Sequence, residues 1–154
     1  MRHADEVLRA VGVSPGQYLL DLGCGEGAFA LPAGRRVGEA GMVFALDCDP
    51  EKLAVLRRAV GGNALNNVAL VQASGEAGIP LAEGTCDVAL VYDVLQMIED
   101  WEPLFAELFR VLRAGGTLSV YPMHVDAGRV KGGCAAAGLV FRSTWQDLLN
   151  FVRP

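Results

Sequence analysis

Three glycines at alternate positions, Gly23, Gly25 and Gly27, form the most informative segment of this 154-residue sequence. They follow the short apolar run 18–22, which predicts a buried strand. Glycine permits a tight turn and lets the backbone approach a ligand closely. The helix expected next would offer free backbone N–H groups to an anion such as a carboxylate. We therefore predict a ligand-binding loop, rather than a turn that only joins a strand to a helix.

An acidic residue, Asp47, ends the next apolar run, twenty residues after Gly27. A carboxylate at this position can accept both hydroxyl hydrogens of a ribose. The alternative role is to cap the helix expected from Pro50, but Asp49 fits that role better because it directly precedes the proline. We predict that Asp47 binds a ribose and that Asp49 caps the helix.

The glycine loop and Asp47 fit two classes of cofactor enzyme. Gly23-x-Gly25-x-x-Ala28 satisfies the relaxed dinucleotide fingerprint G-x-G-x-x-G/A, which favours an NAD(P)-dependent oxidoreductase. Three features favour a different cofactor: Asp21 precedes the first glycine by two residues, the glycines alternate, and the last strands are expected to form an antiparallel hairpin.

Alternating apolar runs and helical patterns must position these residues. Strands are expected at 18–22, 42–46, 68–72, 87–92 and 117–121. Helices are expected at 4–11, 26–38, 50–60, 101–113 and, more weakly, 127–137. Pro32 should kink the second helix or mark a shift within its first turns. Gly115-Gly116 should stop the fourth helix, and Gly132-Gly133 should interrupt the fifth.

Two further β-like runs, 139–145 and 148–152, are joined only by Gln146-Asp147. So short a link cannot carry a parallel crossover, so the two runs should pair antiparallel. The sequence therefore predicts an α/β fold: a doubly wound, Rossmann-like, mostly parallel seven-stranded sheet with a C-terminal antiparallel hairpin. One domain covering residues 1–154 is expected.

Composition disfavours several classes of function. The net charge is −5 and no run of basic residues occurs, so a nucleic-acid partner is not expected. The four cysteines form no CxxC pair and there are two histidines, so no metal site is expected. No apolar run could span a bilayer and no signal peptide is evident, so we expect a cytoplasmic protein with reduced thiols.

Four segments, in order and with fitting spacing, resemble motifs of the class I S-adenosylmethionine-dependent methyltransferases. They are LLDLGCGEGAFA (19–30), ALDCDPEKL (45–53), IPLAEGTCDVALVYDVL (79–95) and FRVLRAGGTLSV (109–120). The resemblance covers nearly the whole chain and is greatest to the small, single-domain type related to ubiquinone and menaquinone biosynthesis. It implies S-adenosylmethionine as the methyl donor and S-adenosylhomocysteine as the product, without a metal.

The resemblance also implies a cofactor site. Asp21, Gly23, Cys24 and Gly25 would line the methionine part; Asp47 would hold the ribose hydroxyls, with Cys48 against the adenine; Ser74 and Gly75 would contact the adenine; and Tyr92 would lie beside the sulfonium through its backbone. Many members of the family carry an acid at the position of Ser74. This chain departs from that pattern, and Glu76 is a candidate substitute.

The acceptor side is less well specified. Asp93, Gln96, Tyr121 and His124 are expected near the strand ends that face the substrate, but none is assigned as catalytic. Met97, Ile98 and Trp101 form either an apolar wall or part of the core. Because the segment 121–126 provides little roof over the site, we expect a second subunit or a large acceptor, such as a protein, to complete it. A binding protein without turnover remains a further alternative.

Overall fold

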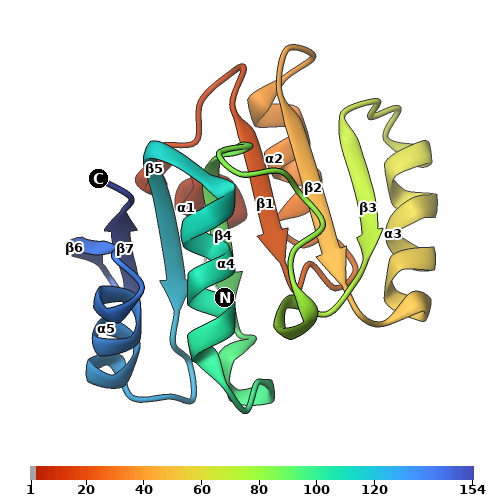
Figure 1. Ribbon diagram of the computed structural model, residues 1–154. Helices are drawn as coiled ribbons and strands as arrows, with labels where there is room; N and C mark the ends of the chain where they lie inside the picture. The colour runs from red at the N-terminus through yellow and green to blue at the C-terminus, as the bar shows by residue number, and fades with distance from the viewer. Residues whose placement is uncertain (1–2) are drawn as a thin grey trace.

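A seven-stranded sheet forms the centre of the computed structural model, which describes residues 3–154 (Figure 1). The strands are β1 (Tyr18–Leu22), β2 (Met42–Asp47), β3 (Val68–Gln72), β4 (Cys86–Tyr92), β5 (Leu112–Tyr121), β6 (Val140–Trp145) and β7 (Leu148–Val152). Their order in the sheet is β3-β2-β1-β4-β5-β7-β6. Strands β1 to β5 pair in parallel, and β7 pairs antiparallel with both β5 and β6. The predicted fold class is confirmed. Met1 and Arg2, which the predicted domain 1–154 includes, lie outside the described residues.

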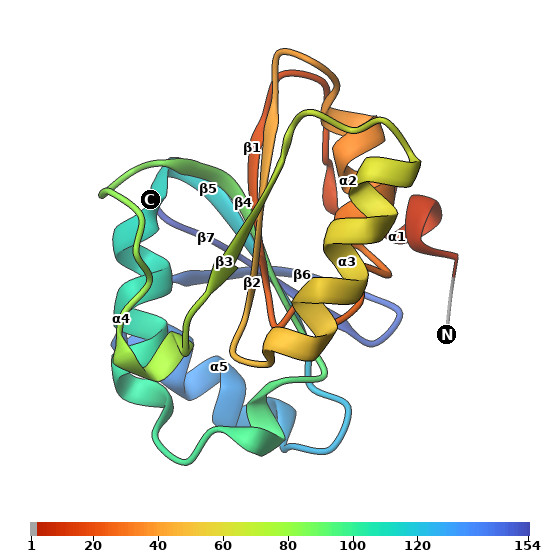
Figure 2. The same ribbon diagram turned by 90° about the vertical axis from the view of Figure 1, so that its right-hand side faces the viewer.

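Helices cover both faces of the sheet (Figure 2). One face carries α1 (Ala4–Val11), α2 (Ala30–Val37) and α3 (Pro50–Gly62), and the other carries α4 (Trp101–Val111) and α5 (Ala127–Ala136). Two short 3₁₀ turns, η1 (Gly75–Ala77) and η2 (Leu95–Met97), follow β3 and β4. Each face has its own apolar cluster, centred on Leu8 and Leu56 on the first and on Leu104 and Phe105 on the second.

Three helix boundaries differ from the prediction by two residues or more. The helix expected from residue 26 begins at Ala30, so Pro32 lies within its first turn, where a missing N–H is tolerated. The helix expected to reach residue 113 ends at Val111, because Leu112 already has an extended backbone and begins β5. The third boundary is that of α3, which was expected to end near residue 60 and continues through Gly62.

The glycines within α5 do not interrupt that helix. Gly133 faces Phe105, and a Cβ atom at Gly133 would lie 2.7 Å from the Phe105 Cε2 atom. The residue is therefore small because α5 packs closely on α4, and tertiary packing outweighs its low helix propensity. The sequence pattern signalled a break where the structure has a close contact between helices.

The predicted terminal hairpin is confirmed. Strand β7 lies inside the sheet with Leu148, Leu149 and Phe151 buried, whereas most of the edge strand β6 is exposed. No helix within residues 3–154 is long and apolar enough to cross a membrane. The same residues contain no group of three or more side chains placed to hold a metal ion.

Candidate active site

A cleft of about 1180 Å³ lies at the carboxyl ends of the parallel strands. Strands β1 and β4 are neighbours there, and the chain leaves β1 and β4 toward opposite sides of the sheet, which is where doubly wound folds bind ligands. The lining contains all nine residues predicted for the cofactor site: Asp21, Gly23, Cys24, Gly25, Asp47, Cys48, Ser74, Gly75 and Tyr92. Their placement around one cleft agrees with the prediction, and their roles toward a ligand stay predictions.

The glycine loop is held in a conformation that larger residues could not share. Gly23, Gly25 and Gly27 have φ values of 76°, 55° and 98°. A Cβ atom on Gly23 would lie 2.3 Å from the Val94 Cγ2 atom, so the loop packs directly against the segment after β4. A Cβ atom on Gly25 would meet nothing within 4 Å. Gly25 therefore leaves open space in the lining of the cleft.

Asp47 is fixed by two backbone donors. Its Oδ2 atom accepts a hydrogen bond of 2.8 Å from the Gly25 N–H, and its Oδ1 atom accepts one of 2.9 Å from the Asp49 N–H. Each carboxylate oxygen has a second lone pair, so Asp47 can still accept two hydroxyl hydrogens. The Asp49 Oδ1 atom accepts from the Glu51 N–H at 2.9 Å, which confirms Asp49 as the cap of α3.

Asp21 is a buried carboxyl group with an unused acceptor. It is only 4 % exposed, and its Oδ2 atom has no hydrogen-bond partner within residues 3–154. Burial and the nearby charge of Asp47 raise the pKa of Asp21 to about 7, and a backbone hydrogen bond from Ala30 opposes the shift. An unpaired buried acceptor costs about 1–3 kcal/mol. A ligand with a cationic donor would satisfy it.

The loop after β3 brings Ser74 and Gly75 to the cleft. Ser74 Oγ accepts a hydrogen bond of 3.3 Å from the Glu76 N–H, which shapes the 3₁₀ turn η1. Gly75 packs against the core, since a Cβ atom there would lie 3.0 Å from the Leu104 Cδ1 atom. Glu76 is exposed and also lines the cleft. The candidate substitute for the missing acid is therefore in a suitable place.

The thiol of Cys24 has no features of a nucleophile. Burial and the charges of Asp21 and Asp47 raise its pKa, so it remains a neutral thiol. Cys48 is exposed at the other wall of the cleft. These two cysteines contribute shape and apolar surface to the lining.

Tyr92 lines the cleft at the end of β4. Its Oη atom donates a hydrogen bond of 2.8 Å to Ser119 Oγ, and its ring meets the ring of Phe29 edge to face at 4.9 Å. Burial raises the pKa of Tyr92, so the phenol keeps its proton. Phe29 was not predicted as a site residue, because its approach to Tyr92 depends on the position of the loop in three dimensions.

Three of the four residues expected on the acceptor side line the cleft: Asp93, Gln96 and Tyr121. Asp93 has a φ of 57°, unusual for a residue other than glycine. The Gln96 Nε2 atom donates to the Asp93 carbonyl oxygen at 3.0 Å and to its Oδ1 atom at 2.6 Å. His124 is exposed and does not line the cleft, so the structure does not bring it together with the other three.

The apolar residues after β4 divide between wall and core. Met97 is 70 % exposed and lines the cleft together with Ile98. Trp101 is buried in the core, where its Nε1 atom donates to the carbonyl oxygens of Leu95 and Ile98 at 3.0 Å each. Met97 and Ile98 therefore belong to the apolar wall, and Trp101 belongs to the core.

The chain's own tail forms part of the roof. Asp147 and Leu148, from the β6–β7 turn, line the cleft, and a smaller cavity of about 490 Å³ beside Tyr121 shares Asp147 with it. Gln96 and Met97 nevertheless remain exposed. The expectation of an incomplete roof thus holds only in part.

Acidic side chains dominate the lining of the cleft. The acids are Asp21, Asp47, Asp49, Glu76, Asp93 and Asp147, and Lys52 is the one lysine or arginine among the described residues that line it. Such a surface attracts a ligand with net positive charge and disfavours an anion.

Comparison with known proteins identifies the family. The family model described as a methyltransferase domain matches residues 20–120. This chain belongs to the class I S-adenosylmethionine-dependent methyltransferase family. The match includes the glycine loop, Asp47 and Tyr92, and it does not favour the NAD(P)-dependent alternative.

Similar proteins include two curated methyltransferases and one solved structure. The chain is 32 % identical over 109 residues to an arsenite methyltransferase of Halobacterium salinarum, covering 70 % of this chain and 27 % of that protein. It is 34 % identical over 110 residues to the ubiquinone/menaquinone biosynthesis C-methyltransferase UbiE of Haemophilus ducreyi, covering 71 % and 42 %. The chain thus spans less than half the length of these two relatives. The crystal structure of a SAM-dependent methyltransferase from Aquifex aeolicus shares the fold, with a TM-score of 0.84, 21 % identity and coverage of 96 % and 87 %.

Proposed function

We propose that this protein transfers the methyl group of S-adenosylmethionine to an acceptor and releases S-adenosylhomocysteine. The observation that carries the proposal is the pairing of two acids beside the glycine loop. Asp47 is held by two backbone N–H groups with acceptor capacity left over, and Asp21 presents a buried oxygen without a partner. The hydroxyl groups of a ribose would donate hydrogen bonds to Asp47, and an ammonium group would donate to Asp21.

The residues of the cleft would hold the cofactor in a defined orientation. We assign the ribose hydroxyls to Asp47, the ammonium group to Asp21 and the adenine to the segment of Ser74 and Gly75. Bound there, the cofactor would supply a methyl group on a positively charged sulfur atom. The protein's contribution to such a displacement is to align the reactants and to exclude water, tasks that fall to Tyr92 and to the walls beside it.

We propose an uncharged aromatic molecule as the acceptor. The described residues of the acceptor side include the aromatic side chains Phe29, Tyr92 and Tyr121 and the acids Asp93 and Asp147. An anionic acceptor would meet like charge there. The named relatives are an arsenite methyltransferase and a C-methyltransferase of ubiquinone/menaquinone biosynthesis. The aromatic lining favours an acceptor of the second class. A protein acceptor, a homo-oligomer, a cytoplasmic location and the absence of a metal and of a nucleic-acid partner stay predictions.

Calorimetric titration with S-adenosylmethionine, S-adenosylhomocysteine and NADH tests the proposal. We expect saturable binding of the two adenosyl ligands and no response to NADH. Transfer of an isotope-labelled methyl group to a panel of hydroquinones and phenols then tests turnover. Tight NADH binding without adenosyl binding would overturn the proposal, and adenosyl binding without transfer to any acceptor would favour a non-catalytic binding protein.

A further inference from the structure

The loop between β3 and β4 carries part of the cofactor site without a long helix to hold it. Ser74, Gly75 and Glu76 line the cleft, and the regular structure between the two strands is limited to the 3₁₀ turn η1. Figure 1 shows the loop crossing in front of β1 and β2 toward α4. A loop of this kind must find partners for its backbone polar groups outside itself.

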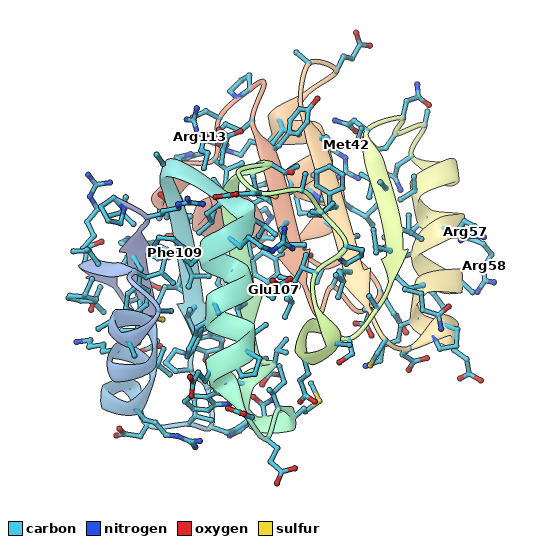
Figure 3. The ribbon with its side chains drawn as sticks, viewed as in Figure 1. Met42, Arg57, Arg58, Glu107, Phe109 and Arg113 are labelled. Atoms are coloured by element: carbon cyan, nitrogen blue, oxygen red, sulfur yellow. The ribbon has the colours of Figure 1, made fainter. Side chains whose placement is uncertain are left out.

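Two side chains of α4 supply these partners. The Arg110 guanidinium donates to the carbonyl oxygens of Leu81 and Ile79 at 2.8 Å each, and the Ile79 N–H donates to Glu107 Oε2 at 2.7 Å. Glu107 and Arg110 also form a bidentate ion pair, with both N–O distances at 2.8 Å. We call this arrangement the Glu107–Arg110 clamp. Figure 3 shows Glu107 on the side of α4 that faces the loop.

The two ends of the connection are held by backbone hydrogen bonds, from the Ala73 N–H to the Asp47 carbonyl oxygen at 3.1 Å and from the Gly84 N–H to the Arg110 carbonyl oxygen at 2.9 Å. Between them, few other side chains hold the loop in place. Among the described residues, the side-chain hydrogen bonds that tie residues 74–83 to distant parts of the chain come from Glu107, Arg110 and Arg153. The bond of Arg153 to Glu83 is longer, at 3.4 Å, and Glu83 is largely exposed. The clamp is therefore the main polar anchor of the loop, and charge-assisted hydrogen bonds of this kind are the strong ones.

We infer that Glu107 and Arg110 are positioning residues for the adenine half of the cofactor site. Ile79, which both residues hold, is three positions after Glu76 in the chain, so the clamp limits where Ser74 to Glu76 can lie. Arg110 belongs to the segment 109–120, which resembles a family motif but does not line the cleft. This inference rests on the proposed function, because it requires the cleft to bind an adenosyl cofactor.

The affinity for S-adenosylhomocysteine tests the clamp without requiring turnover. The apparent affinity is proportional to the fraction of molecules whose loop is in the binding position. Arg110→Ala and Glu107→Ala should lower this fraction and so raise the Kd roughly 5- to 20-fold. Arg110→Lys should give an intermediate value, because lysine lacks the forked donors of arginine. Arg36→Ala is a matched control: Arg36 lies on α2 and donates to the Val13 carbonyl oxygen at 2.6 Å, far from the loop in the sequence and on the other face of the sheet. Its Kd should equal that of the wild type.

A second readout separates positioning from general stability. S-inosylhomocysteine has an oxo group in place of the adenine amino group. The ratio of its Kd to that of S-adenosylhomocysteine therefore measures how strongly the loop discriminates between the two bases. We expect the clamp variants to lose most of this discrimination and to show faster amide hydrogen exchange in residues 74–83 before ligand is added. If an alanine variant does not fold, the same measurements are made on the conservative variants Arg110→Lys and Glu107→Gln.

The outcomes distinguish the two proposals. If the wild type binds S-adenosylhomocysteine and the folded clamp variants match it in affinity and in base discrimination, the clamp inference is wrong and the proposed function stands. If the wild type does not bind S-adenosylhomocysteine at all, the proposed function fails and the clamp inference fails with it.

Discussion

The two halves of the cleft are built in opposite ways. On the cofactor half, Asp21 and Asp47 are 4 % and 8 % exposed, and backbone N–H groups fix Asp47. On the acceptor half, Met97 is 70 % exposed, and Gln96 bonds only to Asp93 within its own turn among the described residues. One half is therefore preorganised by the backbone, and the other depends on side chains at the surface. The comparison predicts that substitutions in the first half change cofactor affinity and those in the second do not.

The largest effect on affinity is expected from Asp47→Ala. The variant loses the carboxylate that we assign to the ribose hydroxyls, and it leaves the Gly25 and Asp49 N–H groups without this acceptor. Charge-assisted hydrogen bonds contribute about 1.5–3 kcal/mol, so the Kd for S-adenosylhomocysteine should rise roughly 10- to 100-fold. Isothermal titration calorimetry measures this change. An unchanged Kd would show that the ribose is held elsewhere.

The matched control for that variant is Asp49→Ala, two residues along. The Asp49 side chain caps α3, and its backbone N–H, which alanine keeps, donates to Asp47. The expected loss is about 1 kcal/mol of unfolding free energy, with a much smaller change in Kd. Chemical denaturation of both variants, alongside titration, compares the two effects.

A smaller, pH-dependent effect is expected from Asp21→Asn. A cationic ligand group favours the carboxylate form of Asp21, whose pKa is raised to about 7 in the free protein. Binding near pH 6.5 should therefore release a proton, visible as a dependence of the calorimetric enthalpy on buffer ionisation. The variant should abolish this release and weaken binding at pH 8 roughly 5- to 20-fold. Proton release that persists in Asp21→Asn would assign it to another group.

The same carboxyl group links stability to pH. Because folding raises its pKa from 3.8 to about 7, the folded state holds a proton that the unfolded state has lost in this range. The resulting stabilisation is fully present below pH 3.8 and is lost as the pH rises through 7. The unfolding free energy of the wild type should thus fall between pH 5 and pH 8 more steeply than that of Asp21→Asn. Equal slopes would show that Asp21 does not titrate there.

The smallest effect is expected from Gln96→Ala on the acceptor half. The side chain is exposed, and its hydrogen bonds support only the left-handed backbone of Asp93. The Kd for S-adenosylhomocysteine should change less than about 2-fold, and the unfolding free energy by about 0.5 kcal/mol or less. A change comparable to that of Asp47→Ala would mean that the two halves are coupled.

The sequence sufficed to group the residues of the cofactor half at one cleft, because local backbone requirements define their positions. Gly23 and Gly25 have positive φ values, and Asp49 is the helix cap because it directly precedes Pro50, which leaves Asp47 available for the predicted ligand contact. Each of these local requirements is met by a particular residue type, so it can be recognised in the sequence. The strand pattern likewise predicted seven strands: the parallel strands have apolar runs, and the short link Gln146-Asp147 indicated the terminal hairpin. The start of β5 was missed, because this strand begins at Leu112 and not at residue 117.

The acceptor half and several helix ends could not be predicted, because long-range packing determines them. Phe29 and Leu148 reach the cleft from segments far apart in the sequence, whereas His124, expected to face the substrate, does not line it. Gly133 resembles a helix breaker, and only its contact with Phe105 explains why α5 continues through it. No local pattern contains such information.

The position of β7 between β5 and β6 has a consequence for the newly made chain. Within the described sheet, β6 pairs with β7 alone, so it emerges from the ribosome with no strand to join. Until β7 is complete, the edge of β5 remains open, and Leu118 and Val120 lack the strand that pairs with them. An open edge of this kind can pair with other chains. A released chain that is cut short within β6 should therefore need a chaperone to stay monomeric.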